Sequence, residues 1–299
     1  MKNYTRTDLA CESMGAAALS EKERHQICRE EEREGFHVTR LTLASKAHSE
    51  RFGKPCGTYV TVSCGHIGYL GEEERERLVR LLSEEIRNMC RQSCGCELSS
   101  SFSVLVAALG NEEITADAIG PRMGRLLTAT RHLRQFDRAL YEQIGRCEIS
   151  VLFTGVLGQT GMETVELVRG AAENVKPDLV LAVDALAARS SSRLAATVQL
   201  CDSGIAPGSG VGNHRKALSR ETVGFPVLAI GVPTVVDSST LVWDALETAG
   251  ISEVSEELTQ VLENGRRFFV TPKESDLITR QVAALLADAI DGAFCVFEG

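Results

Sequence analysis

The chain has 299 residues, of which 43% are hydrophobic and 24% charged, and its formal net charge is -9. A chain of this length and composition can bury a substantial core, which excludes global disorder and predicts one large α/β domain or two smaller ones. The acidic balance argues against a nucleic-acid partner, which requires a basic surface. Because no apolar run is long enough to span a membrane and no secretory signal opens the chain, we expect a cytoplasmic protein with no membrane partner.

Charged segments surround one strand in the first hundred residues. Residues 20–35 are crowded with Glu, Lys and Arg, which is typical of a solvent-exposed helix. Residues 57–63 alternate with β-branched side chains and predict a strand that is antiparallel or at an edge. Residues 72–91 carry apolar side chains at helical spacing, so one side of a helix should face the core; these side chains are Leu78, Leu81, Leu82, Ile86 and Met89.

After residue 100, apolar strands alternate with helices, a pattern that predicts βαβ units and a parallel sheet. The strands are expected at residues 103–109, 149–154, 178–183, 196–201 and 226–230. The helices are expected at residues 121–134, 161–174, 240–249 and 274–290. No internal repeat and no low-complexity linker interrupts this part of the chain.

Two aspartates, Asp117 and Asp184, each follow an apolar run that reads as a parallel strand. Ligands bind outside the carboxyl ends of such strands, so both side chains should reach one crevice and could perform acid/base chemistry. Asp117 could instead cap a helix. Asp184 closes an aliphatic run where an unpaired carboxylate is disfavoured, and a structural ion pair with Arg189 or Arg193 is its alternative role.

Two glycine-rich loops could bind a substrate chain through their backbone amides. The first contains Gly158, Gln159 and Gly161, follows a strand and opens a helix, so its amides could hold a substrate backbone or an oxyanion. The second contains Gly208, Gly210 and Gly212, for which a tight loop is the simpler reading. Neither loop fits a dinucleotide or Walker fingerprint.

The remaining motifs favour structural readings. Ten cysteines are scattered along the chain, so we expect free thiols, and the group at residues 90–96 lacks the spacing of a metal site. Adjacency in Cys64-Gly-His66 rarely gives a Cys/His catalytic pair. The Asp-Ser-Gly run at residues 202–204 occurs once in an α/β pattern, so it does not indicate a pepsin-like enzyme, and Asp202 becomes a third acid at the sheet edge.

Seven ordered motifs closely resemble the germination protease family of spore-forming bacteria, and together they run nearly from end to end. They are Arg6–Glu12, Ala108–Pro121, Gly158–Glu163, Val183–Arg189, Pro207–Arg215, Glu221–Asp237 and Phe269–Glu274. The chain departs from the family pattern at Ala116, where proline is usual, and at Ala108, where glycine is usual.

This resemblance implies an endopeptidase that degrades small acid-soluble spore proteins during germination, without a cofactor. It implies an α/β/α sandwich similar to hydrogenase maturation proteases, a homotetramer, and a location in the forespore or spore core. The two catalytic aspartates of the family map onto Asp117 and Asp184. The family is made as self-processing zymogens, and Thr7–Glu12 looks like the acid-then-apolar cleavage sequence, so processing is expected between Asp8 and Leu9. Residues 1–8 would form the propeptide and residues 9–299 a single peptidase domain.

In the expected mechanism, one ionised carboxylate activates water while the other, protonated, polarises the peptide carbonyl. The sequence leaves open which aspartate is the base. Two alternatives also stay open: a metal-dependent peptidase using Asp117, Asp184 and Asp202, and a non-catalytic peptide-binding protein. A basic side chain would be needed to recognise the acidic residue of the substrate, and the candidates are Arg122, Arg189 and Arg215.

Overall fold

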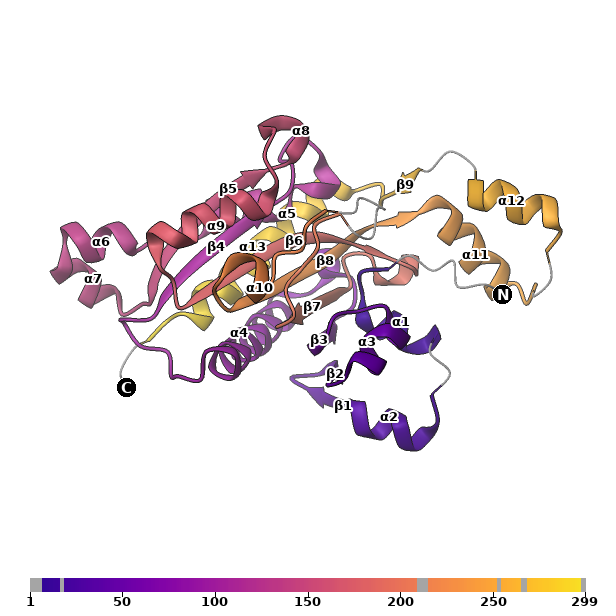
Figure 1. The fold of residues 1–299 in the computed structure, drawn as a ribbon, viewed down its shortest axis with the longest axis horizontal. Helices are drawn as coiled ribbons and strands as arrows, with labels where there is room; N and C mark the ends of the chain where they lie inside the picture. Colours follow the sequence, from indigo (N-terminus) through magenta and orange to yellow (C-terminus); the bar gives the residue numbers. More distant parts are fainter. Residues whose placement is uncertain (1–6, 17–18, 209–214, 252–253, 265–267, 297–299) are drawn as a thin grey trace.

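The computed structural model describes residues 7–16, 19–208, 215–251, 254–264 and 268–296. A twisted sheet forms the centre and helices cover both of its faces, so the described chain has three layers (Figure 1). The predicted α/β/α class is confirmed. None of the helices in the described parts is long and apolar enough to cross a membrane.

The sheet is mixed, whereas the sequence predicted a mostly parallel one. Four neighbouring strands, β5, β4, β6 and β8, run parallel, and the other pairings are antiparallel. The strand order is β1-β2-β3-β7-β8-β6-β4-β5, and β9 pairs with the far end of β8. The strands are β1 Cys28–Arg33, β2 Phe36–Leu43, β3 Gly57–Ser63, β4 Ser103–Leu109, β5 Glu148–Gly155, β6 Leu179–Ala188, β7 Thr197–Cys201, β8 Val227–Asp237 and β9 Phe269–Val270.

Helices divide between the two faces according to which strand side chains they bury. One face packs against α4 (Glu72–Cys94), α5 (Ile119–Leu126) and α13 (Ser275–Ala293). The other face packs against α1 (Ala10–Ala16), α2 (Glu21–Ile27), α3 (Lys46–Phe52), α9 (Thr164–Val175) and α10 (Arg220–Val223). The remaining helical elements are η1 Ile67–Tyr69, η2 Thr115–Asp117, α6 Arg131–Phe136, α7 Arg138–Ile144, α8 Leu157–Thr160, η3 Ser191–Arg193, α11 Ser238–Thr248 and α12 Glu256–Asn264.

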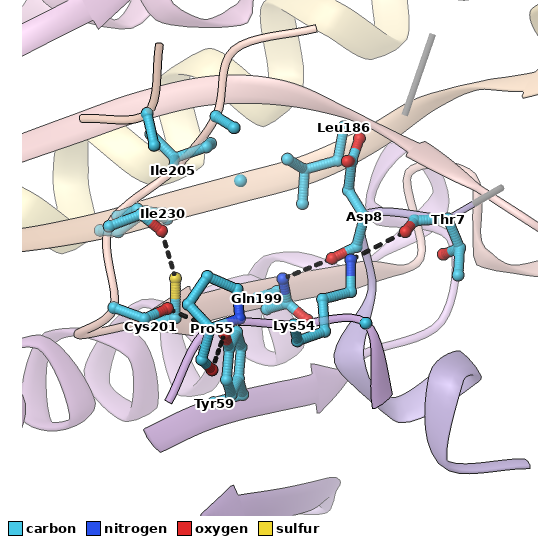
Figure 2. Close-up of a pocket in the computed structure, with 17 residues that line it drawn as sticks. Thr7, Asp8, Lys54, Pro55, Tyr59, Leu186, Gln199, Cys201, Ile205 and Ile230 are labelled. Atoms are coloured by element: carbon cyan, nitrogen blue, oxygen red, sulfur yellow. Dashed lines mark hydrogen bonds between the residues drawn. The ribbon is translucent and has the colours of Figure 1, made fainter. Parts of the chain in front are cut away.

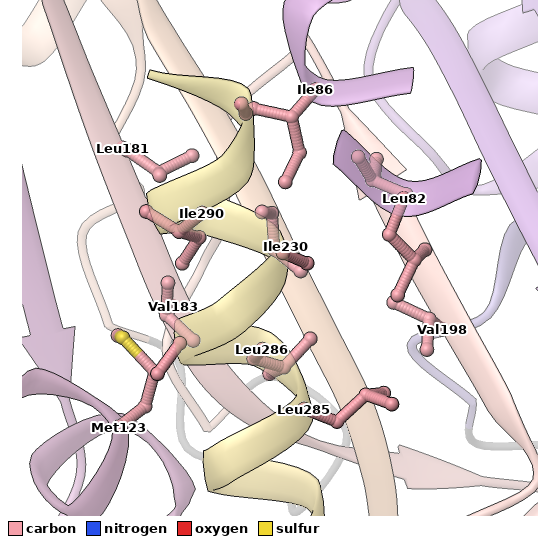
Figure 3. Packing of buried hydrophobic residues seen from close by; sticks show 14 of the residues in the cluster. Leu82, Ile86, Met123, Leu181, Val183, Val198, Ile230, Leu285, Leu286 and Ile290 are labelled. Carbon is pink, nitrogen blue, oxygen red and sulfur yellow. The ribbon is translucent and has the colours of Figure 1, made fainter. Parts of the chain in front are cut away.

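The larger apolar core lies between α13, α4 and the centre of the sheet (Figure 3). Alternate residues of β6 and β8, such as Val183 and Ile230, point into it, while their neighbours point to the opposite face. The expected stripe on α4 is buried as predicted. Because the same alternation continues along β6, the side chain after Val183 faces the α9 side of the sheet.

Residues 20–35 do not form one exposed helix, so that prediction was wrong. Helix α2 ends at Ile27, and β1 follows as the edge strand of the sheet. Its charged side chains stay in solvent because an edge strand is covered on one side only. Glu34 and Gly35 both have positive φ and form the two-residue turn into β2, a geometry that matches the twist of paired strands.

The helix predicted at residues 121–134 is broken. Helix α5 ends at Leu126, and α6 begins at Arg131. Between them the buried Thr130 binds β5 through its hydroxyl, which donates to the Cys147 carbonyl at 2.7 Å and accepts from the Ile149 amide at 2.8 Å. These two hydrogen bonds hold Thr130 against the sheet, which a residue within a continuous helix from 121 to 134 could not reach.

Two central strands are longer than predicted. Strand β6 continues to Ala188 and β8 to Asp237, because they pair with each other beyond the end of β4. A register shift between Leu186 and Ala187 accommodates Pro233, which has no amide hydrogen to give to the ladder. The strands at residues 57–63 and 103–109 have the predicted bounds.

The buried Glu85 of α4 links this helix to the β1–β2 hairpin. It accepts from Arg33, and from Arg40 at 2.7 Å. We expect Glu85→Ala to lower the free energy of unfolding by about 1–3 kcal/mol, because it leaves two partly buried guanidinium groups facing each other. Urea denaturation would measure this. Glu84→Ala is the matched control, since Glu84 binds the same Arg33 from an exposed position; an equal loss in both variants would contradict the assignment.

Candidate active site

Asp184 lies in the interior of β6 and not past its end, which corrects the sequence-based placement. Strand β4 stops at Leu109, level with Asp184, while β6 runs on for four more residues. The end of β4 therefore exposes this side of β6 to a crevice. The Asp184 side chain is 4% exposed, and one of its oxygens accepts from the Ala185 amide at 2.9 Å.

Asp117 is brought to the same crevice by the loop that follows β4. Gly110 has φ +108, and a Cβ there would lie 2.1 Å from the Asp117 carbonyl oxygen, so only glycine lets the loop fold back this tightly. The Asp117 carboxylate accepts from the Asn111 amide at 2.8 Å. The Asn111 side chain is held in turn by Gln159, whose Nε2 donates to its Oδ1 at 3.0 Å.

Asp117 and Asp184 line one cavity of about 370 Å³. No Lys, Arg or His within the described residues forms an ion pair with either carboxylate. The alternative structural partners are engaged elsewhere: Arg189 with Glu247, and Arg193 with the Ser63 hydroxyl at 2.8 Å. The two carboxyl groups therefore line one cavity, and neither has an ion-pair partner in the part of the chain that the structure describes.

Burial raises the pKa of both carboxyl groups, and repulsion from neighbouring carboxylates raises that of Asp184 further. Burial raises the pKa of Asp117, and the hydrogen bond from the Asn111 amide opposes this. Burial raises the pKa of Asp184 well above its usual value, and the Asp117 charge raises it further. A second negative charge is disfavoured beside the first, so the two groups titrate as a coupled pair that favours the singly protonated state.

The N-terminal segment enters this site. Asp8 lines the cavity with the two aspartates, and its backbone amide donates to the Ala187 carbonyl at 2.9 Å. The Asp8 carboxylate accepts from the Ala187 amide at 2.9 Å. Its charge also raises the pKa of Asp184. The carboxylate of Glu12 accepts from the Arg189 and Ser190 amides at 2.8 and 2.9 Å, which fixes the segment further along β6.

A second cavity, of about 330 Å³, lies on the other side of Asp8 and shares Asp8 and Leu186 with the first (Figure 2). Lys54, Tyr59 and Gln199 line it. The Lys54 amine donates to the Thr7 carbonyl at 2.8 Å, and Gln199 donates to the Asp8 carbonyl at 3.1 Å. The segment from Thr7 to Asp8 therefore lies between the two cavities and is held through its backbone carbonyls, as a bound peptide would be.

The glycine-rich loops contribute less to the cavity wall than expected. Gly155, Val156 and Leu157 line the cavity, whereas Gly158 and Gly161 do not, and Gln159 acts behind Asn111. In the second loop Gly208 lines the cavity, and Gly210 and Gly212 lie outside the described residues. The roles of these residues in substrate binding stay predictions.

Of the three candidate arginines, only Arg215 lines the cavity. Arg122 is paired with Asp276 at 2.8 Å. Asp202 does not line this cavity, and its carboxylate accepts from the Thr58 amide at 2.7 Å. The described parts of the chain contain no group of three His, Cys, Asp or Glu side chains that could hold a metal ion.

The cysteines are free, as predicted. Cys64 packs in the larger core, and burial raises the pKa of its thiol to about 12, which opposes a thiolate nucleophile. His66 stacks on Tyr69 with their ring centroids 4.5 Å apart.

Sequence reasoning missed Gln199, Lys54 and Asn111. One signal was available for Gln199: it is the amide in an otherwise apolar strand, and a buried polar side chain needs partners. No local pattern marks Lys54 or Asn111, because their partners come from distant or irregular segments.

The α/β/α fold places two carboxyl groups and a segment of the chain in one cavity, an arrangement compatible with a peptidase. The model of the germination protease family matches residues 7–251. The chain is 36% identical to a germination protease of Caldanaerobacter subterraneus subsp. tengcongensis, covering 96% of this chain and 93% of the relative. It is 34% identical to one of Clostridium acetobutylicum, covering 97% and 94%, and 40% identical to one of Bacillus cereus, covering 82% and 67%. The chain belongs to the germination protease family.

The raised pKa of Asp184 has a consequence for stability. A carboxyl group whose pKa is higher in the folded chain than in the unfolded chain costs stability as pH rises above the unfolded value of about 3.9. We therefore expect Asp184→Asn to unfold at a higher temperature than the parent chain at pH 7, with a difference that shrinks toward pH 4.

Calorimetry across this pH range would measure the effect. Asp276→Asn is the control of opposite sign, since its pKa is lowered by a hydrogen bond from Arg122 and its replacement should lose stability at neutral pH. A pH-independent loss of stability in Asp184→Asn would contradict the burial argument.

Proposed function

We propose that this chain is an endopeptidase that hydrolyses peptide bonds with Asp117 and Asp184 and degrades small acid-soluble spore proteins during germination. The observation that carries the proposal is the pair of carboxyl groups that line one cavity without an ion-pair partner among the described residues, in a cavity that also receives a segment of polypeptide. Such a pair costs stability, and groups of this kind cluster at catalytic sites. Membership of the germination protease family supports the proposed substrate class.

The environments of the two carboxyl groups favour different roles. Asp117 accepts a hydrogen bond from the Asn111 amide, which supports its charged form. Asp184 is more deeply buried and bears the repulsion of both Asp117 and Asp8, which supports its neutral form. In our proposal Asp117 is the base that activates water, and Asp184 is the acid that polarises the carbonyl and helps protonate the leaving amine.

The N-terminal segment is the first substrate in this proposal. Residues 1–8 act as a propeptide that is removed by cleavage between Asp8 and Leu9, and residues 9–299 form the peptidase domain. Support comes from the position of Asp8 in the cavity and from the hydrogen bonds that hold the chain on both sides of it. While it is bound there, the segment excludes other chains, which would keep the uncut protein inactive.

An acid followed by an apolar residue would be recognised in two ways. The Asp8 carboxylate is bound by the Ala187 amide, and Arg215 lines the same cavity. Leu9 is fully buried in a small apolar cluster with Leu186 and Val236. A homotetrameric assembly and a location in the spore core belong to the same proposal and rest on the family alone.

Replacing either aspartate tests the mechanism. Asp117→Asn and Asp184→Asn should each lower the rate of self-processing and of spore-protein cleavage on the order of a thousandfold or more, because a catalytic pair acts as a unit. Mass spectrometry of the fragments gives the rate and the cleavage sites. Asp202→Asn, an acid whose oxygen binds a backbone amide away from this cavity, should keep most activity. Full activity in either of the first two variants would defeat the assignment.

Self-processing should follow first-order kinetics with a rate independent of protein concentration, because Asp8 lines the cavity of its own chain. The product is a chain that begins at Leu9, which intact-mass measurement identifies. A rate that grows in proportion to concentration would instead mean cleavage between molecules.

Exhaustive chelation distinguishes the metal-dependent alternative, since activity that survives it excludes a required cation. Fragment analysis distinguishes a peptide-binding protein, which would leave the substrate intact.

A further inference from the structure

Gln199 connects the sheet to the peptide bond at which we propose cleavage. It lies on β7, is buried, and uses both ends of its side-chain amide. Its Nε2 donates to the Asp8 carbonyl oxygen at 3.1 Å, and its Oε1 accepts from the Ala10 amide at 2.7 Å. Figure 2 shows the first of these bonds, with Lys54 approaching the same segment beside it. Gln199 thus spans the bond between Asp8 and Leu9.

The sheet register places Gln199 in the same row as Asp184. Gln199 on β7 pairs with Gly231 on β8, and Gly231 pairs with Asp184 on β6. Paired residues point to the same face, and two strand spacings separate their backbones by about 10 Å. Gly231 has no side chain, and the Leu186 side chain packs over it, within 2.5 Å of where a Cβ would lie. Leu186 therefore occupies the row between Gln199 and Asp184, and it lines both cavities together with Asp8.

We propose that Gln199 is a catalytic residue whose side-chain N–H binds the carbonyl oxygen of the bond to be cut and stabilises the negative charge that develops there. The inference rests on the cleavage site of the proposed function and adds a third group to its two aspartates. Donors of this kind act because they are already aligned when charge appears. Without Gln199, the negative charge that develops on this oxygen would be stabilised by the Asp184 proton alone.

The reaction balances with these groups. The water oxygen bonds to the Asp8 carbonyl carbon while one water proton passes to Asp117, and the electrons of the C=O bond move onto the oxygen that Gln199 holds. The bond from this carbon to the Leu9 nitrogen then breaks, and the nitrogen takes a proton from the carboxyl pair. The pair has gained one proton and lost one, so it ends as it began.

Lys54 supports the alignment one residue upstream. Its amine donates to the Thr7 carbonyl at 2.8 Å, so three groups of the segment are fixed: the Thr7 and Asp8 carbonyls and the Ala10 amide. These are backbone groups that every polypeptide has. Once residues 1–8 have left, the Lys54 amine and the Gln199 N–H could therefore bind the two corresponding carbonyls of a spore-protein substrate.

Substitutions at Gln199 separate catalysis from anchoring of the segment. We expect full-length Gln199→Leu to self-process about a hundredfold to a thousandfold more slowly than the parent chain, because the donor is lost. Gln199→Glu retains the shape of the side chain. Its carboxylate cannot donate at pH 7, but the protonated acid can, so its rate relative to the parent should rise as pH falls, while Gln199→Leu stays slow throughout.

Thr197→Val is the matched control. Thr197 lies two residues before Gln199 on the same side of β7, is buried, and its hydroxyl has no hydrogen-bond partner among the described residues, so its replacement should leave the rate within a few fold. Thermal unfolding of each variant reports whether it is folded. The inference would be overturned if Gln199→Leu self-processed at a rate close to that of the parent chain. It would also be overturned if the ratio of the Gln199→Glu rate to the parent rate did not change with pH.

Asp184→Asn, measured in parallel, identifies which proposal has failed. If Asp184→Asn is inactive and Gln199→Leu is fully active, the aspartate mechanism stands and the role of Gln199 is lost. If Asp184→Asn still processes at the parent rate, the proposed function itself is wrong and the role of Gln199 falls with it.

Discussion

The burial of Asp184 beside Asp117 is the constraint on which the active site depends. A carboxyl group in the interior of a central strand is expensive to ionise, and a second carboxyl across the cavity makes it more so. Arg189 and Arg193 are bonded elsewhere, and Arg215 lines the cavity but forms no ion pair with either carboxyl group in the described structure. The fold thus maintains a pair that prefers to keep one proton, which is the state required for one group to act as a base and the other as an acid.

The backbone that creates this pair depends on differences in strand length. Because β4 ends level with Asp184 while β6 and β8 continue, the crevice opens against the side of β6, and the extended part of β6 binds the N-terminal segment. Gly110 then turns the chain so that Asp117 returns to the same cavity. If β4, β6 and β8 ended at the same level, the site would lack the exposed stretch of β6 along which a peptide can lie as an added strand.

The sequence predicted the parts of this arrangement that follow from local patterns. Strands such as residues 57–63 and 103–109 have their predicted bounds because their apolar runs end at clear turns. The extensions of β6 and β8 were missed, since they depend on pairing between distant strands, and β1 was missed because a charged edge strand resembles an exposed helix. The two aspartates could be chosen from their position after apolar runs. Gln199 could not be linked to them, because only the register across β7, β8 and β6 brings the three together.

The most direct test of the central claim is the titration of Asp184, followed by NMR of ¹³C-labelled aspartate carboxyl groups in the parent chain and in Asp117→Asn. The account predicts that the pKa of Asp184 is raised in both proteins by burial, and that it is lower in the variant because the repulsion from Asp117 is gone. An Asp184 signal that titrates identically in the two proteins, or with the pKa of an exposed aspartate, would show that the two carboxyl groups do not share a site.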